Sequence, residues 1–339
     1  MASAVGSSKA HGKVILLGEH AVVYGVPALA LGIDRGARAS VTAGPSAAPS
    51  LRIDGRAVEA PEVLQALGAL RSELEAPASE LEAPSSELAA PRRDLAASEL
   101  SVAAELDVPT GSGLGSSAAL GVAIARAALE ALGRPASAER VLAAADAWER
   151  VFHGNPSGID TTAAFYGGCF KFKRGLAPEF VELAAPLRLA IVKAGPAAST
   201  KTMVENVARL RERRPQLVDK TLEGIHSLVQ NAALCLSAGD RTGLGKLMDY
   251  NQMLLSGLFL STPEIERACA IARERGALGA KLTGAGGGGS VIALADDPDA
   301  IVEAWRQAGL EAFVATCSGT AAGVVGAPSS GAARSEPTP

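Results

Sequence analysis

A run of glycines and serines near the middle of the chain limits the local fold more than any other stretch of this sequence. It extends from Pro109 to Ala119, carries alternate glycines at Gly111, Gly113 and Gly115, and opens directly onto an alanine-rich segment. Glycine allows a positive φ and a close approach of the backbone to a ligand, and serine side chains can cap the helix that follows. Because a helix N-terminus presents free N–H groups and the positive end of its dipole, the run predicts a phosphate-binding loop. The alternative is an ordinary glycine-rich loop that is capped by serine.

Length and charge limit the other possibilities. A chain of 339 residues has room for two ordinary domains. The net charge of −4, with neither sign concentrated along the chain, gives no electrostatic reason to expect nucleic acid or an anionic membrane surface as a partner. The apolar run at residues 14–17 is too short for a signal-peptide core or a membrane span. We therefore expect a cytoplasmic protein with a small-molecule partner, no nucleic acid and no membrane.

The four cysteines are widely scattered and show no paired metal-ligand spacing. This pattern suits buried thiols in a reducing compartment better than a disulfide framework. We expect each thiol to be a small core residue. The four are Cys169, Cys235, Cys269 and Cys317.

Apolar periodicity and turn residues divide the chain into elements. The start of the chain is predicted to be rich in strands, and the segment after the glycine run is predicted to be helical. Ser137 is a plausible N-cap for the next helix, which carries Glu149. The predicted strands include residues 13–17, 37–43, 51–53, 187–192 and 291–294, and the predicted helices include residues 117–132, 217–230, 234–250 and 265–275.

The order of these elements predicts two domains. We expect an N-terminal domain over residues 1–184 and a C-terminal domain over residues 185–325, with the boundary just before the strand at residue 187. Residues 326–339 are rich in Pro, Ser and Ala, which predicts a disordered tail.

Residues 72–99 contain a sevenfold-spaced repeat whose leucines imitate a coiled-coil heptad. Pro77, Pro84 and Pro91 argue against a coiled coil, because each proline in a helix interior costs about 3 kcal/mol. We predict a surface insertion with no catalytic part, made of short helical turns or disorder. The alternative is an interaction element.

A second glycine run, residues 284–289, matches the G-x-G-x-x-G dinucleotide fingerprint literally. The fingerprint requires a strand before it and a helix after it, whereas here a strand follows, so we exclude a dinucleotide site. Two interpretations remain, namely a hairpin or tight domain contact and a second wall of a nucleotide cleft.

Several polar side chains stand where packing does not require them. Phosphoryl transfer from a nucleotide needs a divalent cation, a positive charge near the γ-phosphate and a carboxylate for the acceptor hydroxyl. A serine of the glycine run, Ser116 or Ser117, together with Glu149 would supply the oxygen ligands that Mg²⁺ prefers. Asp160 follows a turn, and Lys13 heads an otherwise apolar strand. Taken singly, Glu149 could be a solvated surface glutamate, Asp160 a helix cap and Lys13 an exposed strand end.

Three stretches together resemble the three motifs of the GHMP kinase family of small-molecule kinases. They are residues 13–25, the glycine run and residues 281–290. Within that family, the sequence Gly-Glu-His-Ala-Val-Val-Tyr-Gly at residues 18–25 is similar to the mevalonate kinase branch, and so are residues 153–160 and 199–201. The repeat at residues 72–99 departs from the family pattern.

The resemblance implies an α+β fold, in which a domain of the ribosomal protein S5 domain 2 type is followed by a ferredoxin-like domain, with ATP in the cleft between them. It implies that Ser117 and Glu149 hold Mg²⁺, that Asp160 acts on the C5 hydroxyl of mevalonate, and that Lys13 stabilises the alkoxide and the transferring phosphoryl group. The implied ATP contacts are Pro109, Gly111, Ser112, Gly113, Leu114, Gly115, Ser116, Ser117 and Ala118. The implied substrate contacts are Glu19, His20, Ser157, Thr200, Gly284 and Ala285.

The resemblance leaves room for a homodimer, and two other functions stay open. One is a related kinase that acts on another small alcohol or on phosphomevalonate. The other is a non-catalytic module that binds nucleotide and uses the repeat as a contact surface.

Overall fold

The computed structural model describes residues 4–44, 50–75 and 99–319. Most of the repeat, from residue 76 to residue 98, and the predicted tail at 326–339 lie outside the described residues. In the part that is described, no helix is both long enough and apolar enough to cross a membrane.

The first half of the chain builds a seven-stranded sheet around one long strand, β2. β1 pairs antiparallel with β2 over nearly its whole length, while β5 and β6 pair with the two ends of the opposite edge of β2. β3 runs parallel to β5. The strands are β1 (Ala4–Leu17), β2 (Ala28–Gly44), β3 (Ser50–Ile53), β4 (Arg56–Ala57), β5 (Glu99–Leu106), β6 (Cys169–Phe172) and β7 (Glu179–Phe180).

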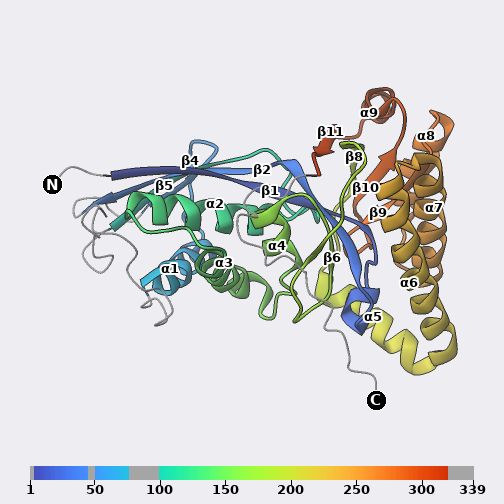
Figure 1. Cartoon of the computed structure of the whole chain (residues 1–339), viewed down its shortest axis with the longest axis horizontal. Helices are drawn as coiled ribbons and strands as arrows, with labels where there is room; N and C mark the ends of the chain where they lie inside the picture. Colours follow the sequence, from blue (N-terminus) through green and yellow to red (C-terminus); the bar gives the residue numbers. More distant parts are fainter. Residues whose placement is uncertain (1–3, 45–49, 76–98, 320–339) are drawn as a thin grey trace, which may run out of the picture.

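Two helices, α2 (Ser116–Ala131) and α4 (Ile159–Tyr166), pack directly on this sheet, and α1 (Pro61–Glu75) and α3 (Ala138–His153) pack against the other helices. Figure 1 shows them together on one side of the long strands. α2 lies directly on β1 and β2, and its many alanines allow the close approach, since a Cβ on Gly6 of β1 would lie 2.1 Å from the carbonyl oxygen of Ala127. Small residues therefore set the distance between α2 and the sheet.

The second half of the chain forms a four-stranded antiparallel sheet with the order β11-β8-β10-β9. The strands are β8 (Leu187–Gly195), β9 (Gly279–Thr283), β10 (Gly289–Leu294) and β11 (Ala312–Cys317). Four helices connect β8 to β9, and one connects β10 to β11. They are α5 (Thr200–Arg213), α6 (Pro215–Ala238), α7 (Arg241–Gly257), α8 (Pro263–Glu274) and α9 (Pro298–Gln307).

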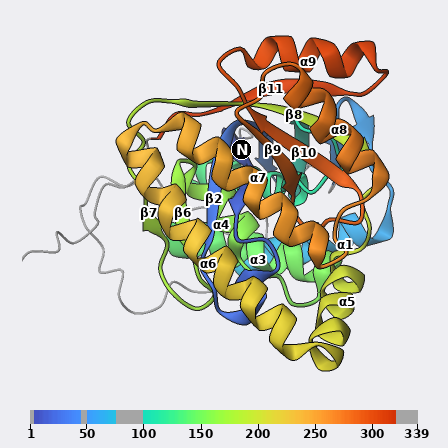
Figure 2. The same cartoon turned by 90° about the vertical axis from the view of Figure 1, so that its right-hand side faces the viewer.

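In this sheet the first strand is central and the second is at an edge, which is the ferredoxin-like order. Figure 2 shows α6, α7 and α8 in front of the sheet and α9 beyond its upper edge. The predicted α+β architecture with two sheets is therefore confirmed.

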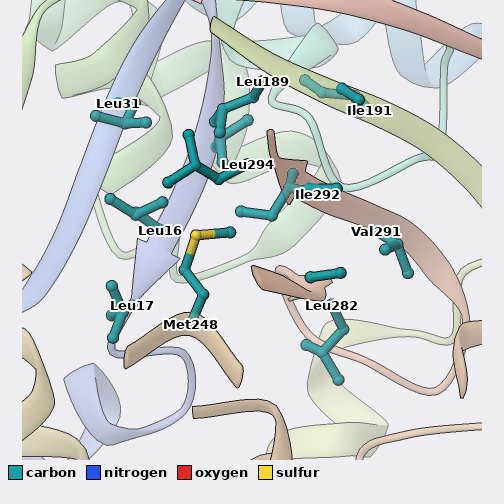
Figure 3. Packing of buried hydrophobic residues seen from close by; sticks show 14 of the residues in the cluster. Leu16, Leu17, Leu31, Leu189, Ile191, Met248, Leu282, Val291, Ile292 and Leu294 are labelled. Carbon is teal, nitrogen blue, oxygen red and sulfur yellow. The ribbon is translucent and has the colours of Figure 1, made fainter. Parts of the chain in front are cut away.

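One cluster of buried apolar side chains joins the two sheets. Leu16 and Leu31 come from the first sheet, and Figure 3 shows them beside Leu189, Leu294 and Met248 of the second half. Side chains from the first sheet therefore form part of the hydrophobic core of the second half of the chain. The domain boundary near residue 185 stays a prediction, because the largest core crosses it.

Several sequence-based expectations about elements were wrong in detail. The helix predicted over residues 234–250 is interrupted, because Gly239 takes a left-handed conformation (φ 72°) that ends α6, and Asp240 caps α7 by accepting from the N–H of Gly243 at 2.8 Å. Residues 21–24, for which no element was predicted, form a short 3₁₀ helix, η1 (Ala21–Tyr24). Three of the cysteines are buried thiols as expected, but Cys235 is partly exposed.

Candidate active site

The glycine run forms a loop of left-handed glycines that leads into α2. Gly111, Gly113 and Gly115 have φ values of 63°, 79° and 73°. Gly115 is the N-cap of α2 and no side chain caps this helix, so the expectation of a serine cap was wrong. The N-terminus of α2 thus keeps its first N–H groups free of a side-chain cap, as an anion site requires.

Lys13 and Asp160 meet beside this loop. Lys13 lies near the end of β1, and its Nζ is 2.8 Å from Oδ1 of Asp160 in the first turn of α4. The ammonium group also donates to the carbonyl oxygen of Gly113 at 3.2 Å, while the backbone N–H of Lys13 donates to Leu114 at 2.8 Å. A Cβ on Gly115 would lie 3.4 Å from Oδ1 of Asp160. A cation, a carboxylate and the glycine loop are therefore adjacent.

Ser117 and Glu149 face each other from α2 and α3. The hydroxyl of Ser117 donates to Oε1 of Glu149 at 2.5 Å, and the indole of Trp148 donates to the same hydroxyl oxygen at 3.2 Å. Nε2 of His153 lies 3.6 Å from Oε2 of Glu149. Burial raises the pKa of Glu149 to about 7, and the carboxylate of Asp160 adds to this rise, whereas the hydrogen bond from Ser117 opposes it.

This pair of oxygen donors fits a Mg²⁺ ion. No cluster of three or more His, Cys, Asp or Glu side chains suited to a metal occurs among the described residues. Mg²⁺ usually takes one or two protein oxygens and completes its shell with waters and substrate phosphates. The hydroxyl of Ser117 and the buried carboxylate of Glu149 are hard ligands of this kind, and they lie at the loop where phosphates are expected.

The second glycine run is the loop of a β-hairpin, because β9 and β10 on either side of it pair antiparallel. The hairpin interpretation is therefore correct, a second wall of a nucleotide cleft stays a prediction, and a helix of the dinucleotide-binding type is absent at this place. The hairpin also touches the first glycine loop, since Ser290 donates to the carbonyl oxygen of Ser112 at 2.9 Å. In addition, the hydroxyl of Thr283 bonds both the N–H and the carbonyl of Ile15, each at 3.0 Å.

Glu19 and His20 lie between β1 and this hairpin. The carboxylate of Glu19 is buried in an ion pair with Lys281 of β9 and accepts from the amide of Asn251 at 3.0 Å. His20 has a φ of 58°, and its Nε2 lies 2.7 Å from the carbonyl oxygen of Ala285 in the hairpin loop. Burial lowers the pKa of His20, which favours the neutral imidazole.

The remaining predicted substrate residues are less closely joined to the site. Ser157 is exposed in the turn before α4, where its hydroxyl accepts from the N–H of Ile159 at 3.4 Å. Thr200 is exposed at the start of α5. Within the described ranges, neither side chain hydrogen-bonds to Lys13 or Asp160.

Sequence reasoning did not assign roles to Lys281, Asn251 and Trp148. Lys281 carried a usable signal, because it is a single charge in an apolar strand, which is the pattern that singled out Lys13. Asn251 and Trp148 lie on helices and carried no signal of that kind.

Two family profiles match the chain. The profile described as "GHMP kinases N terminal domain" matches residues 86–168, and the profile described as "GHMP kinases C terminal" matches residues 231–315. The first range contains the glycine loop, Glu149 and Asp160, and the second contains the hairpin.

Whole-chain comparisons agree with the profiles. The mevalonate kinase of Pyrococcus abyssi is 34% identical over 299 residues, which cover 85% of this chain and 88% of that protein. The mevalonate kinase of Methanothermobacter thermautotrophicus is 35% identical over 289 residues, covering 85% and 89%. The crystal structure of L. major mevalonate kinase in complex with R-mevalonate is similar with a TM-score of 0.78 and 29% identity, covering 95% of this chain and 97% of that one.

Proposed function

The chain belongs to the GHMP kinase family, and from this premise we propose that it transfers the γ-phosphoryl group of ATP to the C5 hydroxyl of (R)-mevalonate, giving 5-phosphomevalonate and ADP. The relatives that are about a third identical over most of their length are mevalonate kinases, which supports this acceptor. The motif at residues 18–25 supports the same branch of the family.

The main structural support for this proposal is the contact between Lys13 and Asp160 beside the glycine loop. Asp160 accepts the proton of the acceptor hydroxyl while that oxygen bonds to the γ-phosphorus, and the bond from the γ-phosphorus to the β–γ bridging oxygen breaks to release ADP. Lys13 holds Asp160 in place and offers its positive charge to the oxygens on which negative charge develops. The N-terminus of α2 and the backbone of residues 111–118 bind the phosphates.

We assign Mg²⁺ to Ser117 and Glu149, since this donor set fits the ion better than a single serine would. When bound, the cation neutralises phosphate charge and acts as a Lewis acid. Ser116, the other candidate, starts α2 one residue earlier, and no hydrogen bond in the described part of the chain joins its hydroxyl to Glu149.

The acceptor is proposed to lie on the side of Asp160 that faces His20 and the hairpin, with Gly284 and Ala285 as its backbone contacts. Direct contacts from Glu19, Ser157 and Thr200 stay predictions. A homodimer also stays a prediction, which sedimentation of the purified chain tests.

An ADP-release assay with four acceptors tests the function. We expect turnover with (R)-mevalonate and none with homoserine, galactose or phosphomevalonate. Silence with mevalonate but turnover of another alcohol would overturn the acceptor, and nucleotide binding without turnover of any acceptor would favour the non-catalytic alternative.

A further inference from the structure

Lys281 and Glu19 form an ion pair in the core between the two sheets. Both side chains are 0% exposed, although they are 262 residues apart in the sequence. Lys281 lies on β9 of the second sheet, and Glu19 follows the end of β1 of the first. The ion pair therefore connects the end of β1 to β9, the strand that precedes the glycine loop of the hairpin.

The pair has two further polar partners. The amide of Asn251 on α7 donates to Oε2 of Glu19 at 3.0 Å, and the ammonium group of Lys281 also donates to the carbonyl of Leu282. A buried ion pair is rarely needed for stability, because apolar side chains of similar volume often stabilise a fold at least as well. Its presence here therefore suggests a role in fixing geometry.

The two residues of the pair lie close in sequence to the two sides of one contact. Glu19 directly precedes His20, which has a strained φ of 58°, and Lys281 lies four residues before Ala285. Nε2 of His20 and the carbonyl oxygen of Ala285 are 2.7 Å apart. The strained backbone persists only where the surroundings hold it, and Glu19 is the neighbouring side chain with two charged or polar partners.

The contact leaves one ring nitrogen of His20 without a hydrogen-bond partner among the described residues. Because a carbonyl only accepts, Nε2 carries the proton of this hydrogen bond, and Nδ1 is an acceptor in the neutral ring. Nδ1 is buried and has no hydrogen-bond partner among the described residues. The hydroxyl group of a small alcohol can donate a hydrogen bond to such a nitrogen.

We propose that Lys281 is a positioning residue, which acts through Glu19 to hold His20 against Ala285 so that Nδ1 accepts a hydrogen bond from a hydroxyl of the acceptor. This inference rests on the proposed function for the identity of the acceptor. Glu19 then acts on the acceptor indirectly, in place of the direct contact that the family resemblance implies.

The test compares the single variants Lys281→Met and Glu19→Gln with the double variant. Each single variant leaves a buried polar group without its partner, and we expect both to lower the thermal midpoint. The double variant leaves no unpaired charge and regains much of the midpoint, but its KM for mevalonate stays about tenfold above that of the wild type, as loss of one positioned hydrogen bond predicts. Its KM for ATP stays within roughly threefold.

A spectroscopic readout separates positioning from general stability. The chain has four histidines, so the ring signals of His20 can be assigned in ¹⁵N-histidine-labelled protein by their loss in His20→Gln. We expect these signals to move in the double variant. They should stay in place in Arg188→Met, which breaks an exposed ion pair with Asp299.

Three outcomes would overturn the proposal. They are a double variant with the wild-type KM for mevalonate, an equal rise of both KM values, and unmoved signals of His20. If the double variant does not fold, Lys281→Arg replaces it, since this change keeps the charge but alters its geometry. A folded Lys281→Arg protein with an unchanged KM for mevalonate and unmoved His20 signals would then overturn the proposal. A wild-type chain that does not turn over mevalonate refutes the proposed function, whereas the signals of His20 still test the pair.

Discussion

Lys13 and Asp160 are brought together from the end of β1 and the start of α4, with 2.8 Å between Nζ and Oδ1. Lys13 is almost fully buried, whereas a third of the Asp160 side chain is exposed. The carboxylate therefore keeps an open side toward a ligand while the lysine fixes the other side. In the proposed reaction this open side receives the proton of the acceptor hydroxyl.

Asp160→Asn removes that proton acceptor but keeps the shape of the side chain. We expect kcat to fall at least about a thousandfold, since a positioned general base contributes roughly a hundredfold to ten-thousandfold. ATP affinity should stay within about twofold, because the proposed phosphate contacts are backbone groups of the glycine loop. Steady-state kinetics and nucleotide titration measure both quantities. Asp299→Asn, at an exposed carboxylate on α9, serves as the control, and near-normal turnover of Asp160→Asn would remove this residue from the mechanism.

The stability of the nucleotide-free protein should depend on the charge of Glu149. Its pKa rises from 4.5 to about 7 because burial disfavours the carboxylate. Between these values the folded chain holds a proton that the unfolded chain releases, so stability falls as the pH rises through this window. Glu149→Gln cannot ionise, and at pH 8 we expect its free energy of unfolding to exceed that of the wild type by up to about 3 kcal/mol.

Denaturant unfolding at pH 4.5 and pH 8, in EDTA and without nucleotide, measures this effect. The difference between Glu149→Gln and the wild type should be small at pH 4.5 and large at pH 8. Glu179→Gln is the matched control, because Glu179 is a glutamate of the same protein that is 70% exposed. An equal difference at both pH values would show that burial of the charge is not the cause.

Local patterns were sufficient to predict the residues that stand out from their own element. Lys13 is the charged first residue of the apolar strand predicted over residues 13–17, and Asp160 follows a turn where no carboxylate is needed for packing. The glycine runs were identified for the same reason, because left-handed backbone requires glycine locally. The start of β1 was missed, since residues 4–12 are mostly small or polar and show no apolar alternation.

Interactions between distant segments could not be predicted in this way. Gly115 is the N-cap of α2, so Ser117 lies inside the first turn, where its hydroxyl donates to Glu149, which is 32 residues away. No periodicity in either segment encodes that pairing or the partner of Lys281. The break between α6 and α7, by contrast, is marked locally by Gly239 as a left-handed C-cap and Asp240 as an N-cap, and the prediction of helices over residues 217–230 and 234–250 placed it several residues too early.

Ser290 should support ATP binding from the strand that follows the hairpin loop. It is fully buried on β10, and its hydroxyl donates to the carbonyl of Ser112 in the glycine loop. Ser290→Ala leaves that carbonyl without this donor and loosens the loop, so the KM for ATP should rise about threefold to tenfold. We expect kcat at saturating ATP to change by less than about twofold. Ser237→Ala, which removes a hydrogen bond to Glu182 on the surface, is the control, and an unchanged KM for ATP in folded Ser290→Ala would contradict this role.

The structure also divides the repeat at residues 72–99 into two parts. Its first residues complete α1, where Leu74 is fully buried and its carbonyl accepts from Arg134 at 3.2 Å and Arg140 at 3.0 Å. Removing a buried leucine typically costs about 2–5 kcal/mol. Deletion of residues 72–99 should therefore lower the thermal midpoint by at least about 5 °C.

Replacing only residues 76–98 with a short Gly-Ser linker spares Leu74 and its two arginine partners. We expect this variant to keep its thermal midpoint within about 2 °C of the wild type and its kcat within about threefold, because Lys13, Asp160, Ser117 and Glu149 all lie outside the deleted segment. Calorimetry and the ADP-release assay measure the two properties on the same preparation. A collapse of kcat in the folded variant would mean that the segment takes part in catalysis, whereas full activity with an altered sedimentation coefficient would favour the interaction element.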